Sequence, residues 1–327
     1  MLKTSNRDTS LDVLKGIGIL LMVFDHVWSN EMTHTYIQSF HMPLFFIVAG
    51  FLWSEKYSIV QKAKRRFFQL MVPYYLWGFI YLAINFVYHS FDLQTLCTNV
   101  KALIIFPTEM KSMPLAPPLW FLPCMFLSDN LFNMIMLKTK KNLQAVLIIT
   151  IVAIGLIYEN TKMPMLPFSI EPVLTGIGFM YLGYLIKKFG AKFHITGNKS
   201  VETLLMLIVA AALAFMQGSV DMRSSRYHFG LLFMLNGLLG TVAYWNLSGL
   251  ISEKSYLVAK FLSYFGRNSL AFLIFNYPVM SFLWKINILP IENKAVLVIV
   301  VYIITVLVCS AADITLKKLN LKWVVGN

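Results

Sequence analysis

Lys15 and His26 are the residues whose types and spacing point most directly to chemistry, because both interrupt an otherwise apolar segment. They are eleven positions apart, and at about 100° per residue this separation comes within about 20° of three helical turns. The two side chains are therefore predicted to face the same way, about 16 Å apart along the helix axis. An imidazole titrates near physiological pH, and one beside a carboxylate is a candidate general base. His26 and Asp25 are therefore the predicted catalytic pair, in which Asp25 orients the imidazole.

Asp12 precedes Lys15 by three residues, the spacing at which side chains on one helix can pair. Ionisable groups inside a membrane span are costly unless they face a cavity or a partner. A functional role is therefore the default interpretation of Lys15 and His26. A lysine near the end of a span can also extend its ammonium group to the interface. For Lys15 the functional and the structural interpretations both stay open.

His41 opens a second segment of interest, which contains Pro43 and Gly50. These two residues predict a kinked and closely packed helix with His41 at its outer end. The histidine is either an interfacial anchor or a residue of an acceptor site, and the sequence alone leaves both open.

A basic run follows, with Lys62, Lys64, Arg65 and Arg66 within five positions. One interpretation is an anchor on the cytoplasmic side of a membrane helix. The other is a phosphate-binding patch, since the guanidinium fork matches phosphate oxygens. Further along, Asp129 is a carboxylate in the middle of an apolar run, where it requires a partner or a water-filled cavity.

The elements that must position these residues are membrane helices. Hydrophobic residues make up 58% of the 327 positions and charged residues 13%, whereas a soluble domain carries about a quarter charged residues. Uncharged runs near the length that a hydrocarbon core requires recur along the chain. Ten spans are predicted, at residues 11–28, 37–53, 70–89, 118–137, 143–158, 172–186, 201–217, 229–251, 261–284 and 294–312. The moderately apolar segment 93–106 is expected to lie flat on the outer face.

The predicted fold is therefore all-α: a single polytopic domain over residues 1–327 with about ten transmembrane helices. The net charge of +13 does not indicate nucleic-acid binding, because the basic residues lie between the apolar runs. Most of the 28 lysine and arginine residues fall on the cytoplasmic side when the N-terminus is placed there and the spans alternate. Both termini are accordingly predicted to be cytoplasmic.

Several segments in this order resemble the membrane acyltransferase-3 family, and within it the branch of fucose 4-O-acetylases of surface polysaccharides. They are Leu11 to Gly16 continuing to His26, His41 to Phe46 continuing to Phe51, the basic run leading to Pro73 and Tyr74, Trp120 to Leu122, and Gly266 to Leu270. They extend over nearly the whole chain, and the first two are the more specific ones.

The resemblance implies that an acetyl group moves from cytoplasmic acetyl-CoA to a hydroxyl of a glycan. His26 matches the family's proposed catalytic histidine, Lys15 the basic residue thought to engage the coenzyme, and Arg66 the first arginine of an R-x-x-R motif. Gln69 stands where the second arginine of that motif is expected. Asn276 stands where relatives often have a histidine before a proline, so no catalytic role is carried over to it.

These observations predict a membrane-embedded O-acyltransferase, most simply an O-acetyltransferase, that acts on a cell-surface polysaccharide or a lipid-linked sugar of the cell envelope. Acetyl-CoA is the expected acyl donor, with no bound cofactor and no metal. The lipid bilayer of the inner (plasma) membrane is the expected environment. Lys15, Arg65 and Arg66 are assigned to the coenzyme. Asp12 and His41 are assigned to the acceptor substrate.

Two alternatives remain. A transporter or flippase for a lipid-linked glycan or a small anion would share the helices, the polar residues within spans and the basic inner loops. Transporters often show inverted repeats, and no repeat is visible in this sequence. The second alternative is an inactive relative that serves as an assembly partner, which the departures at Gln69 and Asn276 suggest. The sequence leaves open which sugar is modified and whether the acyl group is acetyl or longer.

Overall fold

The computed structural model describes residues 9–28, 30–88, 92–105, 107–108, 115–158, 166–190, 198–286 and 293–326. These residues form helices joined by short turns, and none of them lies in a β-strand longer than an isolated bridge. The helices are α1 (Thr9–Trp28), α2 (Glu31–Gln38), α3 (His41–Phe51), α4 (Ile59–Arg66), α5 (Val72–Tyr88), α6 (Leu93–Ile105), α7 (Phe121–Lys138), α8 (Lys141–Tyr158), α9 (Ile170–Phe189), α10 (Lys199–Gln217), α11 (Gly230–Lys254), α12 (Tyr256–Arg267), α13 (Ser269–Ile286) and α14 (Lys294–Lys318). Short π or 3-10 turns add η1 (Phe67–Met71), η3 (Pro117–Trp120), η4 (Pro167–Ser169) and η5 (Lys322–Val325).

Eight helices in the described part of the chain are long and apolar enough to cross a membrane. They cover residues 59–88, 117–138, 141–158, 167–189, 199–217, 230–254, 269–286 and 294–318. The all-α polytopic membrane fold is thereby confirmed. α1 has 20 residues and matches a ninth expected span, although it carries three charged side chains.

Two of the expected spans do not form the single long helix that was predicted for each. The segment 37–53 contains α3, whose 11 residues reach only about 16 Å, about half of the hydrocarbon thickness. The segment 261–284 is not one helix, because the chain breaks at Asn268 between α12 and α13. Hydropathy continues through both places, so it cannot reveal a change of helix direction.

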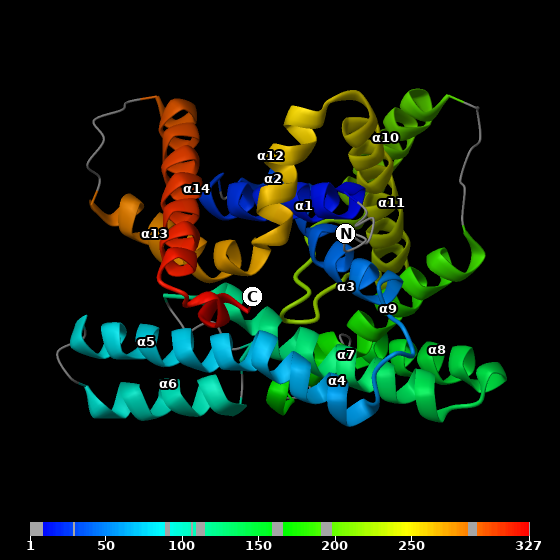
Figure 1. The fold of residues 1–327 in the computed structure, drawn as a ribbon, viewed down its shortest axis with the longest axis horizontal. Coiled ribbons are helices and arrows are strands. Elements are labelled where there is room, and N and C mark those ends of the chain that lie inside the picture. Colours follow the sequence, from blue (N-terminus) through cyan, green and yellow to red (C-terminus); the bar gives the residue numbers. More distant parts are fainter. Residues whose placement is uncertain are drawn as a thin grey trace, which may run out of the picture.

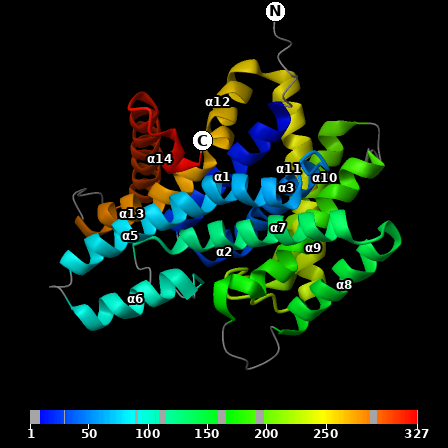
Figure 2. The ribbon, with the colours of Figure 1, turned by 60° about the horizontal axis from the view of Figure 1, so that its bottom comes forward.

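α6 covers most of the segment 93–106, which was expected to lie flat on the outer face, and the structure packs it against α5. Both views show α6 running alongside α5 (Figures 1 and 2). The Tyr74 hydroxyl donates a hydrogen bond of 2.6 Å to the carbonyl of Leu103, and the Leu103 side chain packs over Gly78. α6 is therefore a packed helix beside a membrane span.

The outer face of α14 shows why the fold belongs in lipid. Val296, Ile299, Ile303 and Leu307 lie three or four residues apart on one side of the helix, and each is 46–62% exposed. On a soluble protein such a face would be polar. The same kind of exposed aliphatic surface covers α5, α8 and α10.

α1 lies inside the helix assembly and packs against α3, α11, α12, α13 and α14 (Figures 1 and 2). Its crossing with α12 requires glycine on both helices. A Cβ atom at Gly16 would lie 2.0 Å from the carbonyl oxygen of Leu262, and one at Gly266 would lie 1.8 Å from that of Asp12. This backbone-to-backbone contact fixes the position of α1 next to the residues of the site.

Candidate active site

One face of α1 lines two neighbouring cavities. Lys15, Ile19, Met22 and His26 recur at intervals of four, three and four residues, the spacing of a single helix face. The histidine cavity, of about 330 Å³, is lined by His26, His34 and His41 together with Trp120, Arg223 and Tyr277 among others. The basic cavity, of about 340 Å³, is lined by Lys15, Arg66, Gln69 and Arg267 among others.

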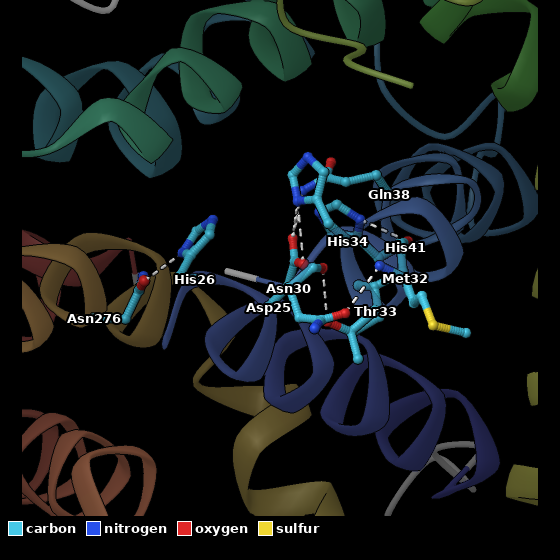
Figure 3. A network of polar contacts seen from close by, with 10 residues as sticks. Asp25, His26, Asn30, Met32, Thr33, His34, Gln38, His41 and Asn276 are labelled. Carbon is cyan, nitrogen blue, oxygen red and sulfur yellow. Dashed lines mark hydrogen bonds and ion pairs between the residues drawn. The ribbon is translucent and has the colours of Figure 1, made fainter. Parts of the chain in front are cut away.

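His26 is held by Asn276 of α13. The Nδ1 atom of the ring lies 2.7 Å from Oδ1 of the amide, as Figure 3 shows. The Nδ2 atom of Asn276 donates to the carbonyls of Phe272 at 2.6 Å and Leu273 at 3.0 Å, so Oδ1 must be the acceptor that faces the ring. The hydrogen of the neutral imidazole therefore lies on Nδ1 and its lone pair on Nε2.

Asp25 does not orient His26, which corrects the sequence-based expectation. Its carboxylate lies 3.1 and 3.2 Å from Nδ1 of His34, and it accepts a hydrogen bond of 2.7 Å from Nε2 of Gln38. Successive residues of a helix point about 100° apart, so the two side chains diverge (Figure 3). Asp25 is 2% exposed and fastens α2 to the end of α1.

His34 was not singled out from the sequence. It lies on α2, outside the spanning helices, and its half-exposed ring lines the histidine cavity. The hydrogen bond to Asp25 raises the pKa of His34, with Coulomb attraction from Asp25 and Asp221 adding to it and partial burial opposing it. The charged form of this ring is consequently stabilised relative to that of an ordinary histidine.

His41, the other predicted acceptor-site residue, is 2% exposed at the start of α3 and lines the histidine cavity. Its Nδ1 atom lies 2.9 Å from the carbonyl of Ile37. The carbonyl can only accept, so Nδ1 is the donor and the lone pair of the neutral ring lies on Nε2. The structure thus brings His41 into the same cavity as His26.

Arg223 enters this cavity from the segment 218–229 between α10 and α11. An isolated bridge between Asp221 and Arg226 folds that segment back on itself. Burial lowers the pKa of the Arg223 guanidinium, and the nearby Asp221 carboxylate, 3.7 Å from its Nη2 atom, opposes that effect. No periodic pattern marks this segment, which is why the sequence did not reveal it.

Lys15 lines the basic cavity, and its ammonium lies 2.9 Å from the Asp12 carboxylate. Asp12 was expected to bind the acceptor, but it is not among the residues that line either cavity. It holds the lysine in place instead. Arg267, from the Gly266–Leu270 segment, lines the same cavity. Among the described residues it has no carboxylate partner, and its Nε atom donates to the Ser263 carbonyl at 3.2 Å.

The side chains of the basic run lie in two different places. Arg66 lines the basic cavity and pairs with the fully buried Asp129, to which Lys62 also contributes an ion pair of 2.8 Å. The expected partner of this carboxylate is thus present. Arg65, which was assigned to the coenzyme, does not line the cavity and donates to the Tyr57 hydroxyl at 2.9 Å. Gln69 faces the basic cavity, and its Oε1 atom accepts from Arg66 at 3.3 Å.

The two cavities are lined by residues from segments that were expected on opposite sides of the membrane. Arg66 and Arg267 come from segments expected on the cytoplasmic side, and both line the basic cavity. Pro117 and Arg223 come from segments expected on the outer side, and both line the histidine cavity. Each cavity is therefore associated with one side of the predicted arrangement.

Lys15 and His26 were expected to face the same way, and in the structure they line two cavities that meet. Met22, Met42 and Leu273 are the residues that line both of them. This set, the methionine–leucine wall, is nearly buried, with 2%, 6% and 6% exposure respectively. The cation and the imidazole share a helix face but lie on opposite sides of the wall.

A membrane-embedded helical site with a basic cavity at one end and an oriented imidazole at the other fits an enzyme of group transfer. A family model described as an acyltransferase domain matches residues 8–313. The chain belongs to this family, the membrane acyltransferase-3 family, and is an acyltransferase.

A relative is the nodulation protein NolL of Mesorhizobium japonicum, which is 27% identical over 239 residues. The match covers 65% of this chain and 57% of the relative, so the chain spans little more than half of that protein's length. No solved structure matches the chain.

Proposed function

We propose that this acyltransferase moves an acetyl group from acetyl-CoA to a hydroxyl of a cell-surface polysaccharide or a lipid-linked sugar at the inner (plasma) membrane. The observation that carries this proposal is the His26–Asn276 contact. It sets the tautomer of the imidazole so that Nε2 can take a proton inside a cavity that adjoins a second, basic one.

His26 acts as the general base. As the acceptor oxygen attacks the thioester carbonyl, its proton passes to Nε2 and a C–O bond forms. The C–S bond then breaks, and the proton passes from the imidazolium to the departing sulfur, which leaves as the thiol of coenzyme A. The Asn276 carbonyl oxygen stabilises the imidazolium through Nδ1–H in between. General-base assistance of this kind contributes about 10²–10⁴-fold.

The basic cavity is the proposed site for the phosphates of acetyl-CoA. Lys15 and Arg66 are held by Asp12 and by Asp129, which positions both cations without occupying all of their donors. Arg267 supplies a guanidinium without a carboxylate partner among the described residues. A guanidinium matches phosphate oxygens in geometry, and we assign Arg66 and Arg267 to this role rather than Arg65.

The histidine cavity is the proposed site for the sugar. Trp120 and Tyr277 provide ring surfaces, and Gln38, His41 and Arg223 provide polar groups around them. Apolar walls with a few placed polar groups are typical of small-molecule sites. A sugar, with an apolar ring face and hydroxyl edges, fits such a lining.

The test uses a strain in which this gene is deleted. Proton NMR of its purified surface polysaccharide is expected to lack an O-acetyl signal that the intact gene restores and the His26→Ala gene does not. In a second step, the full chain in nanodiscs receives radiolabelled acetyl-CoA and the alkali-treated polysaccharide of the deletion strain. Label is expected in the polysaccharide. An unchanged ester pattern in the deletion strain, together with intact acetyl-CoA in the second assay, would refute the proposal.

A further inference from the structure

The methionine–leucine wall stands between the two proposed binding sites. Met22 comes from α1, Met42 from α3 and Leu273 from α13, so three separate helices meet at this point. On α1 the order along one face is Lys15, Ile19, Met22, His26. Any group that travels from the cation to the imidazole must pass Met22.

The distance to be covered makes passage necessary. Lys15 and His26 are about 16 Å apart along the axis of α1, and they line different cavities. If the coenzyme phosphates lie near Lys15, only the acyl end of the molecule can approach His26. The thioester must therefore pass the three side chains that line both cavities.

Side chains rather than helices are suited to this opening. The backbone of α1 is pressed against α12 at Gly16 and Gly266, so it has no room to move toward that helix. Leu273 is held through its carbonyl, which accepts from the Asn276 amide at 3.0 Å. Methionine, in contrast, is unbranched, has three rotatable side-chain bonds and adapts to irregular spaces. Rotation of Met22 and Met42 opens the wall while the helices stay in place.

We propose that the methionine–leucine wall is an acyl gate, formed by Met22, Met42 and Leu273, that admits an acetyl group and excludes longer acyl chains. This inference rests on the proposed function and names its donor class. Opening by rotamer change creates only a small gap, because the three side chains are nearly buried and are surrounded by core residues. Each additional methylene on the acyl group must displace more of the packed core.

The experiment compares acetyl-, propionyl- and butyryl-CoA as donors for the wild-type chain and for Met22→Ala and Leu273→Ala, each full length in nanodiscs. The acceptor is the alkali-treated surface polysaccharide of the deletion strain. One methylene in an apolar pocket is worth about 10–200-fold in discrimination. The wild-type protein is expected to prefer acetyl by such a factor, and each alanine variant is expected to lower the acetyl-to-propionyl ratio about tenfold or more.

Met136→Ala is the matched control. Met136 lies on α7, is 6% exposed as Met42 is, and lines neither cavity. Its replacement creates a similar void in the core, with a comparable loss of stability. The acyl profile of this variant is expected to equal that of the wild-type chain, which separates the gate from general loosening of the fold.

Met22→Leu keeps the test decisive if the alanine variants fold poorly. This swap preserves volume and is well tolerated in cores, but it replaces a flexible side chain with a branched one. Acetyl transfer is expected to slow several-fold while the affinity for coenzyme A is retained. If Met22→Leu transfers acetyl at the wild-type rate and folded alanine variants keep the wild-type acyl profile, the gate is refuted. If the wild-type chain transfers no acyl group from any donor, the proposed function itself fails.

Discussion

Asn276 offers the sharpest test of the catalytic proposal, because it contacts His26 through one atom and is otherwise committed to its own helix. The amide Oδ1 lies 2.7 Å from Nδ1 of the ring, and Nδ2 donates to the carbonyls of Phe272 and Leu273. Asn276→Ala removes the acceptor for Nδ1–H without touching the basic cavity, since Asn276 does not line it. The change should therefore affect the chemical step and leave coenzyme binding intact.

The expected size of the effect follows from two contributions. In the ground state, a net hydrogen bond of about 0.5–1.5 kcal/mol no longer favours the tautomer with its lone pair on Nε2. In the transition state, the ring is charged, and a hydrogen bond to a charged group is worth about 1.5–3 kcal/mol. Since about 1.4 kcal/mol corresponds to a factor of ten, we expect kcat to fall about 10–100-fold, with KM for acetyl-CoA unchanged.

A double-mutant cycle distinguishes this role from a structural one. Transfer of label from acetyl-CoA to the alkali-treated polysaccharide is measured for Asn276→Ala, for His26→Ala and for the double variant. If Asn276 acts through His26, its replacement costs little once the imidazole is gone, because residues that act as a unit are not additive. An undiminished 10–100-fold loss in the His26→Ala background would refute the reasoning.

Asn130→Ala is the control for this cycle. Asn130 also lies on a membrane helix, and its Nδ2 atom donates to the carbonyl four residues earlier, that of Phe126, at 2.7 Å. It lines neither cavity. Its replacement reproduces the loss of a back-bonded helix amide, and kcat is expected to stay near the wild-type value.

Three further predictions follow from the site. His26→Ala should lower acetylation about 10²–10⁴-fold with normal membrane insertion, checked by NMR of the polysaccharide and by membrane fractionation; near-normal acetylation would remove His26 from the mechanism. Lys15→Ala is combined with Asp12→Asn so that no buried charge is left unpaired. The double variant should raise the Kd for acetyl-CoA about tenfold or more without altering acceptor preference. An unchanged Kd in a calorimetric titration would make the lysine structural. The raised pKa of His34 means that its contribution to stability is complete below the ordinary histidine pKa and is lost as pH rises through the raised value. The Tm of the wild-type chain in detergent should therefore fall over that range, by an amount equivalent to about 0.5–1 kcal/mol for this partly exposed pair, relative to His34→Gln. Parallel Tm curves would contradict this.

The residues of α1 show what a sequence can reveal. Lys15 and His26 were predicted on one helix face from their spacing alone, and both do line cavities on that face. The prediction works because helical periodicity is a local property that each turn repeats. The apolar composition of the spans is local in the same sense, and it predicted the polytopic all-α fold.

The partners of those residues required the structure. The contact between His26 and Asn276 joins positions 250 residues apart, and no local pattern encodes such a pairing. The neighbour in sequence, Asp25, was the natural guess for an orienting group, but helix geometry turns it toward His34. Arg223 was missed for a related reason, since irregular segments carry no periodicity that would indicate which way a side chain points.

The departure at Asn276 illustrates how a missing motif residue can be misjudged. The absence of a histidine before Pro278 was taken as a reason to assign no role to this position. In the structure the amide oxygen lies against Nδ1 of His26, where an accepting atom is needed, and an asparagine oxygen can accept a hydrogen bond as an imidazole nitrogen can. The asparagine at this position therefore contacts the proposed base, and under the proposed function it has a role.

The wall between the cavities also bears on how such an enzyme avoids wasting its donor. A base that can deprotonate a sugar hydroxyl can deprotonate water equally well, so the thioester must be kept from His26 until an acceptor is bound. On the shared face of α1, the residues between the cation and the imidazole are Ile19 and Met22 rather than polar ones. An apolar barrier excludes water from the route of the acyl group, whereas a polar lining would admit it. The same side chains that we propose to limit acyl length would thereby also restrict hydrolysis of the donor.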